Sequence, residues 1–379
     1  MNTTANGKEF AISLLPEKDI KIIIQHWIRI FNIKLGWIND FDKLVAKYAK
    51  YFQLLKILQG HDKGISSVRF SANGRKIISA SLDKTVCIWD CITGQQVQTF
   101  EGHFNRVIIA AFSPNGQIIA SCSADQTVRL WDVNSGREIA KLEGHSDWVW
   151  DMNFSPDGNN IASCSTDKTI RLWDVNSKKE IRKLEGHASG VLGVQFSPNG
   201  QMIVSASTDK TVTLWSVQSG ERLKQFIGHS DFVTRAQFSP DGQFIVSCSD
   251  DKTIRIWNVE IGKELKRLEG HLDGVNDVKY FPDGQTIVSS SSDETVRLWD
   301  IKTGNEIQKL EGHSDWVKCV DINKRIFIKN YLNTLIQLVY CIFVSCYSDQ
   351  KYFNSKKDLS WISQIKSFNN KNNIILIKM

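Results

Sequence analysis

The sequence predicts an all-β fold made of tandem four-stranded units, and three regularities of the 379-residue chain support this prediction. The dipeptide Gly-His recurs seven times, and successive histidines are 42 residues apart (for example 103 − 61): His61, His103, His145, His187, His229, His271 and His313. A tryptophan follows each of the first six histidines 28 residues later, at Trp89, Trp131, Trp173, Trp215, Trp257 and Trp299. Between these markers, short stretches of alternating apolar residues are separated by Gly, Pro, Asn and Asp, which is typical of strands and tight turns.

One unit, residues 144–186, shows how the chain is expected to build each sheet. Alternation of apolar residues predicts the strands. The segment Ser155-Pro156-Asp157-Gly158 predicts a tight turn, because proline fixes φ and glycine accepts a positive φ. The four expected strands are residues 148–154, 161–165, 169–173 and 180–184. Their apolar faces can be buried only against a neighbouring unit, so we expect the units to stack side by side.

Asp follows the tryptophan in four of the six units, and Ser216 and Asn258 take the other two places. The Gly-His start of each unit and the Trp-Asp pair of these four resemble the WD40 family of β-propellers, over roughly residues 53–322. The resemblance implies an all-β, seven-bladed WD40 β-propeller, whose last blade is degenerate and is closed by an N-terminal strand. That closing strand is expected in residues 54–61, LLKILQGH, which align with the outer-strand segment EIAKLEGH at 138–145.

The same resemblance implies a structural hydrogen-bonded tetrad in each complete blade. It joins the Gly-His histidine, a serine of the second strand, the aspartate of the next turn and the third-strand tryptophan. In the third blade the serine would be either Ser163 or Ser165. The His, Asp and Trp members of the six blades are His61, Asp83 and Trp89; His103, Asp125 and Trp131; His145, Asp167 and Trp173; His187, Asp209 and Trp215; His229, Asp251 and Trp257; and His271, Asp293 and Trp299.

Serine, histidine and aspartate could also form a catalytic triad, and this is the main enzymatic alternative. A nucleophilic site would need one exposed and oriented copy, whereas the same groups recur here in six blades, as expected of a scaffold. Each histidine is alone in its repeat and the cysteines form no CxxC pair, so no metal site is expected. The sequence therefore predicts a protein that is not an enzyme and has no cofactor.

Three regions are expected along the chain. Residues 1–52 are predicted to form a short α-helical N-terminal extension, since the apolar residues from Ile20 to Phe31 follow helical spacing. This helix would either cap the propeller or dock a partner. Residues 53–322 would hold six complete blades and the start of the seventh. Residues 323–379 contain no Gly, Pro, Ala or Glu, and are interpreted as a degenerate seventh blade with a basic tail, or in part as translated non-coding sequence.

Charge is distributed unevenly along the chain. Residues 323–379 carry 9 Lys/Arg and 2 Asp/Glu, whereas the repeats, 59–322, carry 29 and 34. A nucleic-acid reader should show a basic face on its folded domain, so direct nucleic-acid binding is not expected. The N-terminus lacks the apolar core of a secretory signal, and the run 331–346 is too short and too interrupted for a membrane span. Because no disulfide framework is visible, an intracellular location, cytoplasmic or nuclear, is expected.

The resemblance also implies where a partner would bind. In family members that bind peptides, the residues three and five after the Gly-His histidine, and the residue before the turn aspartate, point toward the central channel. These places vary between repeats here, while the framework hardly does. The predicted protein-binding rim consists of Arg106, Trp148, Trp150, Phe232, Asp250, Asn276, Trp316 and Lys318. Trp148 and Trp150 together resemble the aromatic pair that clamps an arginine-bearing peptide in the histone-methylation scaffolds of the family.

The sequence thus predicts a non-catalytic interaction scaffold that binds peptide segments or partner domains on the propeller face, within a multiprotein complex. The alternative is a subunit of a ribonucleoprotein or RNA-processing complex, which would recruit through the basic C-terminal tail. The alternative predicts a steep salt dependence and loss of binding when residues 323–379 are removed.

Overall fold

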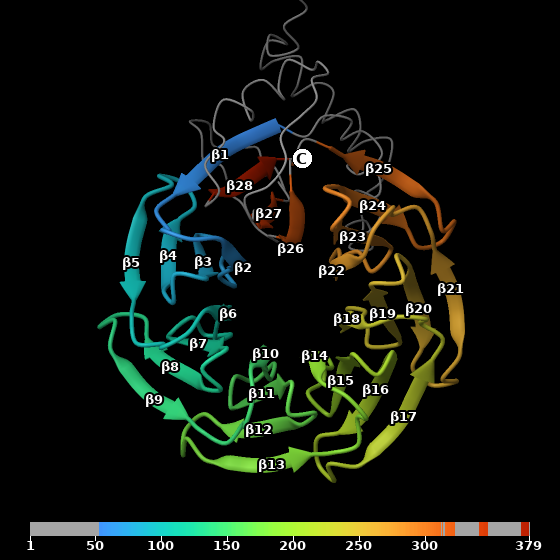
Figure 1. Ribbon diagram of the computed structural model, residues 1–379, viewed down its shortest axis with the longest axis horizontal. Coiled ribbons are helices and arrows are strands. Elements are labelled where there is room, and N and C mark those ends of the chain that lie inside the picture. Colours follow the sequence, from blue (N-terminus) through green and yellow to red (C-terminus); the bar gives the residue numbers. More distant parts are fainter. Residues whose placement is uncertain (1–52, 312, 314, 323–340, 348–372, 379) are drawn as a thin grey trace, which may run out of the picture. The chain divides into compact units, whose positions relative to one another are not determined.

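The computed structural model describes residues 53–311, 313, 315–322, 341–347 and 373–378 of the chain. The chain divides into two compact units, residues 1–50 and 51–379, and the described residues all belong to the second. Within that unit the strands form four-stranded antiparallel sheets around a central axis (Figure 1). The first strand of each repeat lies nearest to the axis and the fourth lies at the periphery.

Six sheets are built from consecutive strands, and we number them blades 1 to 6. Blade 1 comprises β2 (Ile65–Phe70), β3 (Lys76–Ser81), β4 (Val86–Asp90) and β5 (Gln96–Phe100), and blade 2 comprises β6 (Val107–Phe112), β7 (Ile118–Ser123), β8 (Val128–Asp132) and β9 (Glu138–Leu142). Blade 3 comprises β10 (Val149–Phe154), β11 (Asn160–Ser165), β12 (Ile170–Asp174) and β13 (Glu180–Leu184), and blade 4 comprises β14 (Val191–Phe196), β15 (Met202–Ser207), β16 (Thr211–Ser216) and β17 (Arg222–Ile227). Blade 5 comprises β18 (Val233–Phe238), β19 (Phe244–Ser249), β20 (Ile254–Asn258) and β21 (Glu264–Leu268), and blade 6 comprises β22 (Val275–Tyr280), β23 (Thr286–Ser291), β24 (Val296–Asp300) and β25 (Glu306–Leu310).

A β-bulge interrupts the pairing of the first two strands in every blade. In blade 3, Phe154 pairs with Ile161, but the register shifts between Val149 and Asp151 and leaves Trp150 as the extra residue. The same shift occurs at the corresponding place in the other five blades. A bulge bends the strand locally and changes the direction of its side chain, so the bulged residue does not follow the regular alternation of side chains between the two faces of the sheet.

The hydrophobic core lies between the blades. Ile170 and Leu172 of blade 3 share one buried cluster with Val194, Phe196 and Trp215 of blade 4. Clusters of the same kind join blade 2 to blade 3 and blade 4 to blade 5. Each blade therefore depends on its neighbours for burial of its apolar faces, as stacked repeats require.

The remaining sheet is assembled from the two ends of the described chain. Its strands, in spatial order, are β1 (Gln53–Gln59), β28 (Asn373–Lys378), β27 (Cys341–Tyr347) and β26 (Trp316–Ile322). Asn276 of blade 6 donates a 2.9 Å hydrogen bond to the backbone oxygen of Val317. On the other side, Phe70 N–H of blade 1 donates a 2.8 Å hydrogen bond to Asp321 Oδ2. We call this sheet the composite sheet.

The predicted seven-bladed fold is wrong in its number of blades, although the described fold is all-β. Only six blades carry the repeat with its Gly-His, turn aspartate and tryptophan, so a six-bladed WD40 propeller replaces the predicted seven-bladed one. The composite sheet does not continue the repeat, because β28 carries no tryptophan and is distant in sequence from β27. The described residues contain no helix, and residues 1–52, where the helical extension was predicted, lie outside them.

Candidate functional site

The same four side chains are joined by hydrogen bonds in all six blades. In blade 3, His145 Nδ1 lies 2.8 Å from Asp167 Oδ2, and His145 Nε2 lies 2.8 Å from Ser163 Oγ. Ser163 Oγ also accepts a 2.8 Å hydrogen bond from Trp173 Nε1. The serine is thus Ser163, whereas Ser165 donates to a backbone oxygen of the preceding loop. In the other blades the His–Asp distance is 2.7–2.8 Å, the His–Ser distance 2.6–2.8 Å and the Trp–Ser distance 2.8 Å.

The hydrogen-bonding capacity of each tetrad is used internally. An ionised aspartate only accepts, so His145 Nδ1 carries the proton in this pair, and Ser163 directs its own hydrogen toward Nε2. Burial acts to raise the pKa of Asp167, but hydrogen bonds from His145 and Thr169 outweigh it and hold this pKa well below its usual range. The pKa values of Asp83, Asp125, Asp209, Asp251 and Asp293 are lowered in the same way. The tetrad therefore acts as a structural network.

Nucleophilic chemistry has no accessible group in these networks. Ser163 is fully buried and already accepts from the indole, whereas a catalytic serine must reach its substrate. Burial raises the pKa of the thiols of Cys122, Cys164 and Cys248 above the usual range, so they stay protonated.

Among the described residues, no group of three or more His, Cys, Asp or Glu could hold a metal ion. In the same part of the chain there is no helix long and apolar enough to cross a membrane.

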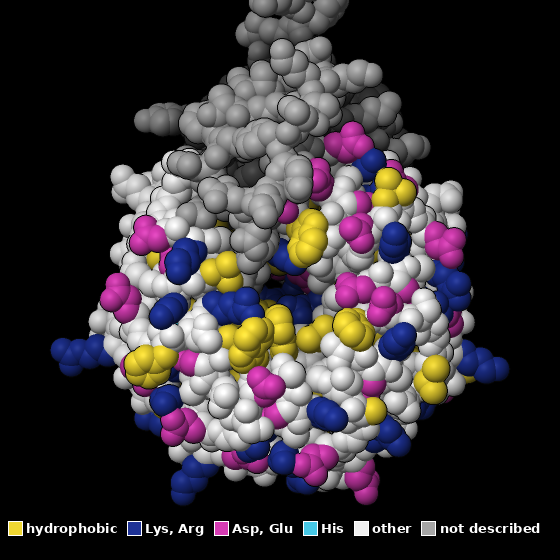
Figure 2. All heavy atoms as spheres, in the orientation of Figure 1, with side chains coloured by type: hydrophobic (Ala, Val, Ile, Leu, Met, Phe, Trp, Pro, Cys, Tyr) yellow, Lys and Arg dark blue, Asp and Glu magenta, His cyan; other side chains and the backbone are white. Residues whose placement is uncertain are grey.

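The predicted rim lies where the innermost strands begin. The residue five after each histidine is the bulged residue of its strand, such as Trp150 in β10 and Lys318 in β26. The bulges thus place the most variable residues of the repeat at one end of the channel. Figure 2 shows hydrophobic side chains gathered around the central opening, with basic and acidic side chains next to them.

Three predicted rim residues form one cluster. The rings of Trp148 and Trp150 lie 5.7 Å apart between centroids, at an angle of 54°. Arg106, from the loop before β6, lies over Trp148 with its Cζ 4.1 Å from the ring centroid. Trp150 Nε1 donates a 2.7 Å hydrogen bond to Thr166 Oγ1. We call Arg106, Trp148 and Trp150 the aromatic cluster, and its members hold one another in place across the boundary of blades 2 and 3.

Four further rim residues carry exposed aromatic surface and charge. Phe232 is 44% exposed, and its backbone oxygen accepts a 2.9 Å hydrogen bond from Asp250 N–H. Burial raises the pKa of Asp250, and the nearby charge of Asp231 adds to this effect. Trp316 is 47% exposed, with Lys318 Nζ 4.4 Å from its ring centroid. Burial lowers the pKa of Lys318 against the opposing effect of Asp250.

Asn276, the last predicted rim residue, has a structural contact. Its amide nitrogen donates to Ser292 Oγ at 3.1 Å and to Val317 O at 2.9 Å, and so links blade 6 to the composite sheet. Thr234 makes the equivalent link from blade 5 to blade 6, by donating a 2.6 Å hydrogen bond to Val275 O. A polar residue at the bulge can therefore join neighbouring blades by a hydrogen bond. This structural role could not be predicted from the position of the residue in the sequence.

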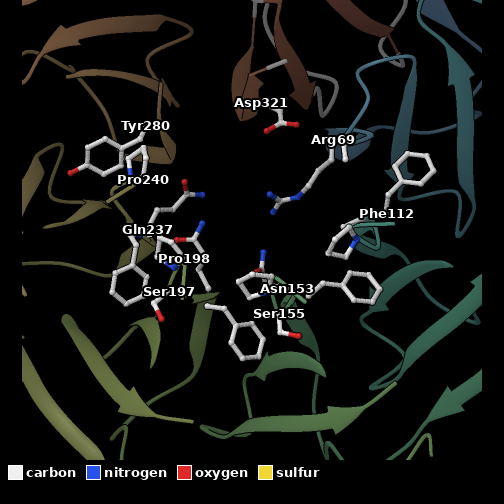
Figure 3. Close-up of a pocket in the computed structure, with 18 of the residues that line it drawn as sticks. Arg69, Phe112, Asn153, Ser155, Ser197, Pro198, Gln237, Pro240, Tyr280 and Asp321 are labelled. Carbon is white, nitrogen blue, oxygen red and sulfur yellow. Dashed lines mark hydrogen bonds between the residues drawn. The ribbon is translucent and has the colours of Figure 1, made fainter. Parts of the chain in front are cut away.

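A cavity that was not predicted from the sequence lies at the opposite end of the channel. This cavity, of about 520 Å³, is lined by the ends of the innermost strands and by the Ser-Pro turns that follow them. Arg69, Asn153, Gln237 and Asp321 line it, and Figure 3 shows their side chains around one space. A signal was present in the sequence, because the residue eight after the histidine is polar or charged in six of the seven repeats. These residues are Arg69, Asn153, Gln195, Gln237, Lys279 and Asp321.

With the six equivalent blades and their tetrads described, comparison with known proteins defines the class of protein. The model of the WD40 family, described as "WD domain, G-beta repeat", matches residues 52–90, 94–132, 136–174, 178–216, 220–258 and 262–300. These segments cover more than half of the chain, which therefore belongs to the WD40 family. WD40 propellers are typically protein-interaction scaffolds in complexes and are generally non-catalytic.

Several curated proteins match short parts of the chain. Protein Mut11 of Chlamydomonas reinhardtii is 42% identical over 48 residues, which are 13% of this chain and 13% of that protein. The retinoblastoma-binding protein 5 homolog of Drosophila melanogaster is 43% identical over 42 residues, 11% of this chain and 9% of that protein. The Notchless protein homolog of Arabidopsis thaliana is 40% identical over 62 residues, 16% of this chain and 13% of that protein. The matched segments thus span no more than 13% of these relatives.

Proposed function

We propose that this chain is a non-catalytic scaffold that holds a peptide segment or partner domain on its rim, within an intracellular multiprotein complex. The observation that carries the proposal is the exposed aromatic surface at the rim. Phe232 and Trp316 expose 44% and 47% of their surface, at the place that Trp148 occupies in blade 3. Hydrophobic side chains gather around the central opening in Figure 2, and exposed apolar patches mark interaction sites. Trp and Arg are enriched among the residues that dominate binding energy.

The aromatic cluster supports the proposal because it is ordered before any partner arrives. Trp150 is fixed by its hydrogen bond to Thr166, and Trp148 lies between Trp150 and Arg106. Side chains that are already held in place lose little conformational freedom on binding, which favours affinity. The buried tetrads support a non-catalytic role, since they leave their serines and histidines without access to a substrate.

The name of one relative, the retinoblastoma-binding protein 5 homolog, describes a protein that binds another protein, in line with the proposal. Docking through the predicted helix Ile20–Phe31 stays a prediction, because those residues lie outside the described part of the chain. The RNA-processing alternative depends on residues 323–379, most of which lie outside it as well, and no described contact favours it.

Affinity capture with two matched triple variants tests the proposal. The rim variant is Trp148→Ala, Trp150→Ala and Phe232→Ala. The control is Ile181→Ala, Leu223→Ala and Leu265→Ala, which removes side chains that are 47–51% exposed on the outer strands β13, β17 and β21. We expect the rim variant to lose partners that the control and the unmodified protein retain. Equal partner sets for all three proteins, with unchanged unfolding midpoints, would contradict a binding rim.

A further inference from the structure

The cavity at the far end of the channel contains hydrogen-bond donors that lack acceptors. Arg69 lines the cavity and carries five N–H donors, yet its side chain forms no hydrogen bond with the described residues, and its nearest carboxylate oxygen is Asp151 Oδ1 at 3.8 Å. Lys279 is not part of the lining but lies beside it, with its Nζ 4.0 Å from Oδ1 of the lining residue Asp321. Their side chains are only 20% and 12% exposed. Each cation thus has one carboxylate within 4.0 Å but no hydrogen-bond acceptor in this part of the chain, so its N–H donors can still bind an anionic ligand.

Two amides add neutral donors to the same space. Gln237 is 8% exposed, its side-chain amide forms no hydrogen bond with the described residues, and this side chain points into the cavity in Figure 3. Asn153, from blade 3, lines the cavity, and its side-chain amide is likewise without a hydrogen bond among these residues. Gln195, between them, uses its oxygen to accept a 2.7 Å hydrogen bond from Phe238 N–H, so its NH₂ group is the part still available. The donors therefore come from several blades.

The acidic groups near the cavity are already in use. Asp321 Oδ2 accepts from Phe70 N–H at 2.8 Å. Asp151 accepts from Met152 N–H at 2.8 Å and from Val194 N–H at 3.2 Å. Burial lowers the pKa of Lys279, and the adjacent positive charge of Arg69 lowers it further. Asp277, Asp321 and Asp151 act in the opposite direction on this pKa, but they do not outweigh burial and Arg69, so an added anion would stabilise the charged lysine.

We propose that this cavity binds a small phosphate-bearing ligand through Arg69, Lys279 and the amides of Asn153 and Gln237. Its volume of about 520 Å³ is typical of small-molecule sites, which span roughly 300–1,000 Å³. The donors come from four blades, three of them lining the cavity and Lys279 beside it. A tetrahedral phosphate can accept from several directions, whereas a planar carboxylate presents its two oxygens to one side. The site is independent of the rim, since it lies at the other end of the innermost strands.

The chain itself supplies conservative variants for the test. Gln195 and Gln237 occupy, in blades 4 and 5, the place that Arg69 and Lys279 occupy in blades 1 and 6. Arg69→Gln and Lys279→Gln therefore introduce a residue that the repeat already accommodates. Lys168→Gln is the matched control, because it removes an exposed charge at a turn where blade 2 carries Gln126.

Isothermal titration calorimetry of the full chain with inorganic phosphate, at constant ionic strength, measures the proposed binding. We expect Arg69→Gln and Lys279→Gln each to weaken phosphate binding about tenfold or more, as loss of one charge-assisted contact implies. Lys168→Gln should bind within about twofold of the unmodified chain. Asp321→Asn, which removes a negative charge but keeps an acceptor for Phe70, should bind phosphate more tightly.

Acetate at the same concentrations distinguishes phosphate from carboxylate, and we expect it to bind at least about tenfold more weakly. The proposal is overturned if phosphate gives no saturable heat up to about 10 mM. It is also overturned if folded Arg69→Gln and Lys279→Gln bind like the unmodified chain, or if acetate binds as well as phosphate.

Discussion

Arg106 lies over the ring of Trp148, with its Cζ 4.1 Å from the ring centroid. The arginine precedes the first strand of blade 2 and the tryptophan precedes that of blade 3, so this contact crosses a blade boundary. It means that one face of Trp148 already carries a cation from the chain itself. An arginine from a partner would have to displace Arg106 from this face or use another surface of the aromatic cluster.

Replacement of Arg106 tests whether this cation belongs to the binding surface. We expect Arg106→Ala to weaken binding of rim-dependent partners about tenfold, because it removes a guanidinium held ready for contact and loosens Trp148. The free energy of unfolding should fall by only about 0.5–1 kcal/mol, as for one partly exposed cation–π contact. Quantitative capture and urea unfolding measure the two effects. Tighter binding by the variant would instead show that a cation of the partner takes the place of Arg106.

Two tryptophan-to-phenylalanine variants separate the buried tetrad from the rim. Trp173→Phe removes the indole N–H that donates to Ser163 and leaves a gap between blades, so we expect it to lower the free energy of unfolding by about 2–4 kcal/mol. Trp150→Phe removes an indole N–H that donates to Thr166 at a similar distance, but near solvent, and should cost less than about 1 kcal/mol. Chemical denaturation of both proteins gives the comparison. Equal losses would argue against a special structural role of the tetrad.

The pH dependence of stability should report the tetrad aspartates. Burial acts to raise the pKa of Asp167, but the hydrogen bonds that its carboxylate accepts from His145 and Thr169 lower this pKa overall. The carboxylate therefore stays ionised in the folded state at a pH at which it binds a proton in the unfolded chain. Its contribution is therefore complete above the unfolded pKa, near 4, and is lost as the pH falls below that value. We expect the unfolding midpoint to change little between about pH 7 and 5 and to fall steeply below about pH 4.

Asp167→Asn provides the control for that prediction. The variant should be less stable at neutral pH, because an amide is a weaker acceptor for His145, and its stability should fall less steeply between about pH 5 and 3. An acid slope identical to that of the unmodified protein would exclude Asp167 as a source of the pH dependence.

The turn residue after each tetrad aspartate offers a stabilising change. Lys168 has a φ of 70°, a left-handed conformation that costs an L-residue energy and glycine almost none. We expect Lys168→Gly to raise the free energy of unfolding by about 0.5–1 kcal/mol. Gly158→Ala should do the opposite, since Gly158 has a φ of 77° and a Cβ there would lie 3.2 Å from Pro114 Cδ. A shift of both urea midpoints in the same direction would contradict this reasoning.

The repeat spacing was sufficient to predict the six complete blades, because each marker residue has one structural role that recurs every 42 residues, but not the number of blades in the propeller. The tetrad serine was left open between Ser163 and Ser165, since both point to the same side of a strand and only the observed contacts distinguish them. The closing strand was expected in residues 54–61, and β1 lies in the composite sheet, but β28 could not be predicted from the repeat because it shares none of its markers.

The two ends of the channel were predictable to different degrees. The rim positions were predicted from the family resemblance. Backbone geometry, which the sequence did not show, places a β-bulge at these positions and lets Asn276 link two sheets. The cavity was not predicted because its lining residues, such as Arg69 and Gln237, are distant in sequence. Each lies eight residues after a Gly-His histidine, but only the arrangement of the blades around the axis brings the two side chains to the same cavity.

Site-specific cross-linking tests the central claim, that partners bind at the rim, most directly. A photoreactive amino acid is placed at Phe232 in one protein and at Leu223 in another, two side chains of similar exposure, 44% and 47%, on the rim and on the outer strand β17. We expect partners to cross-link at Phe232 and not at Leu223. Cross-linking of the same partners at Leu223, with none at Phe232, would contradict it.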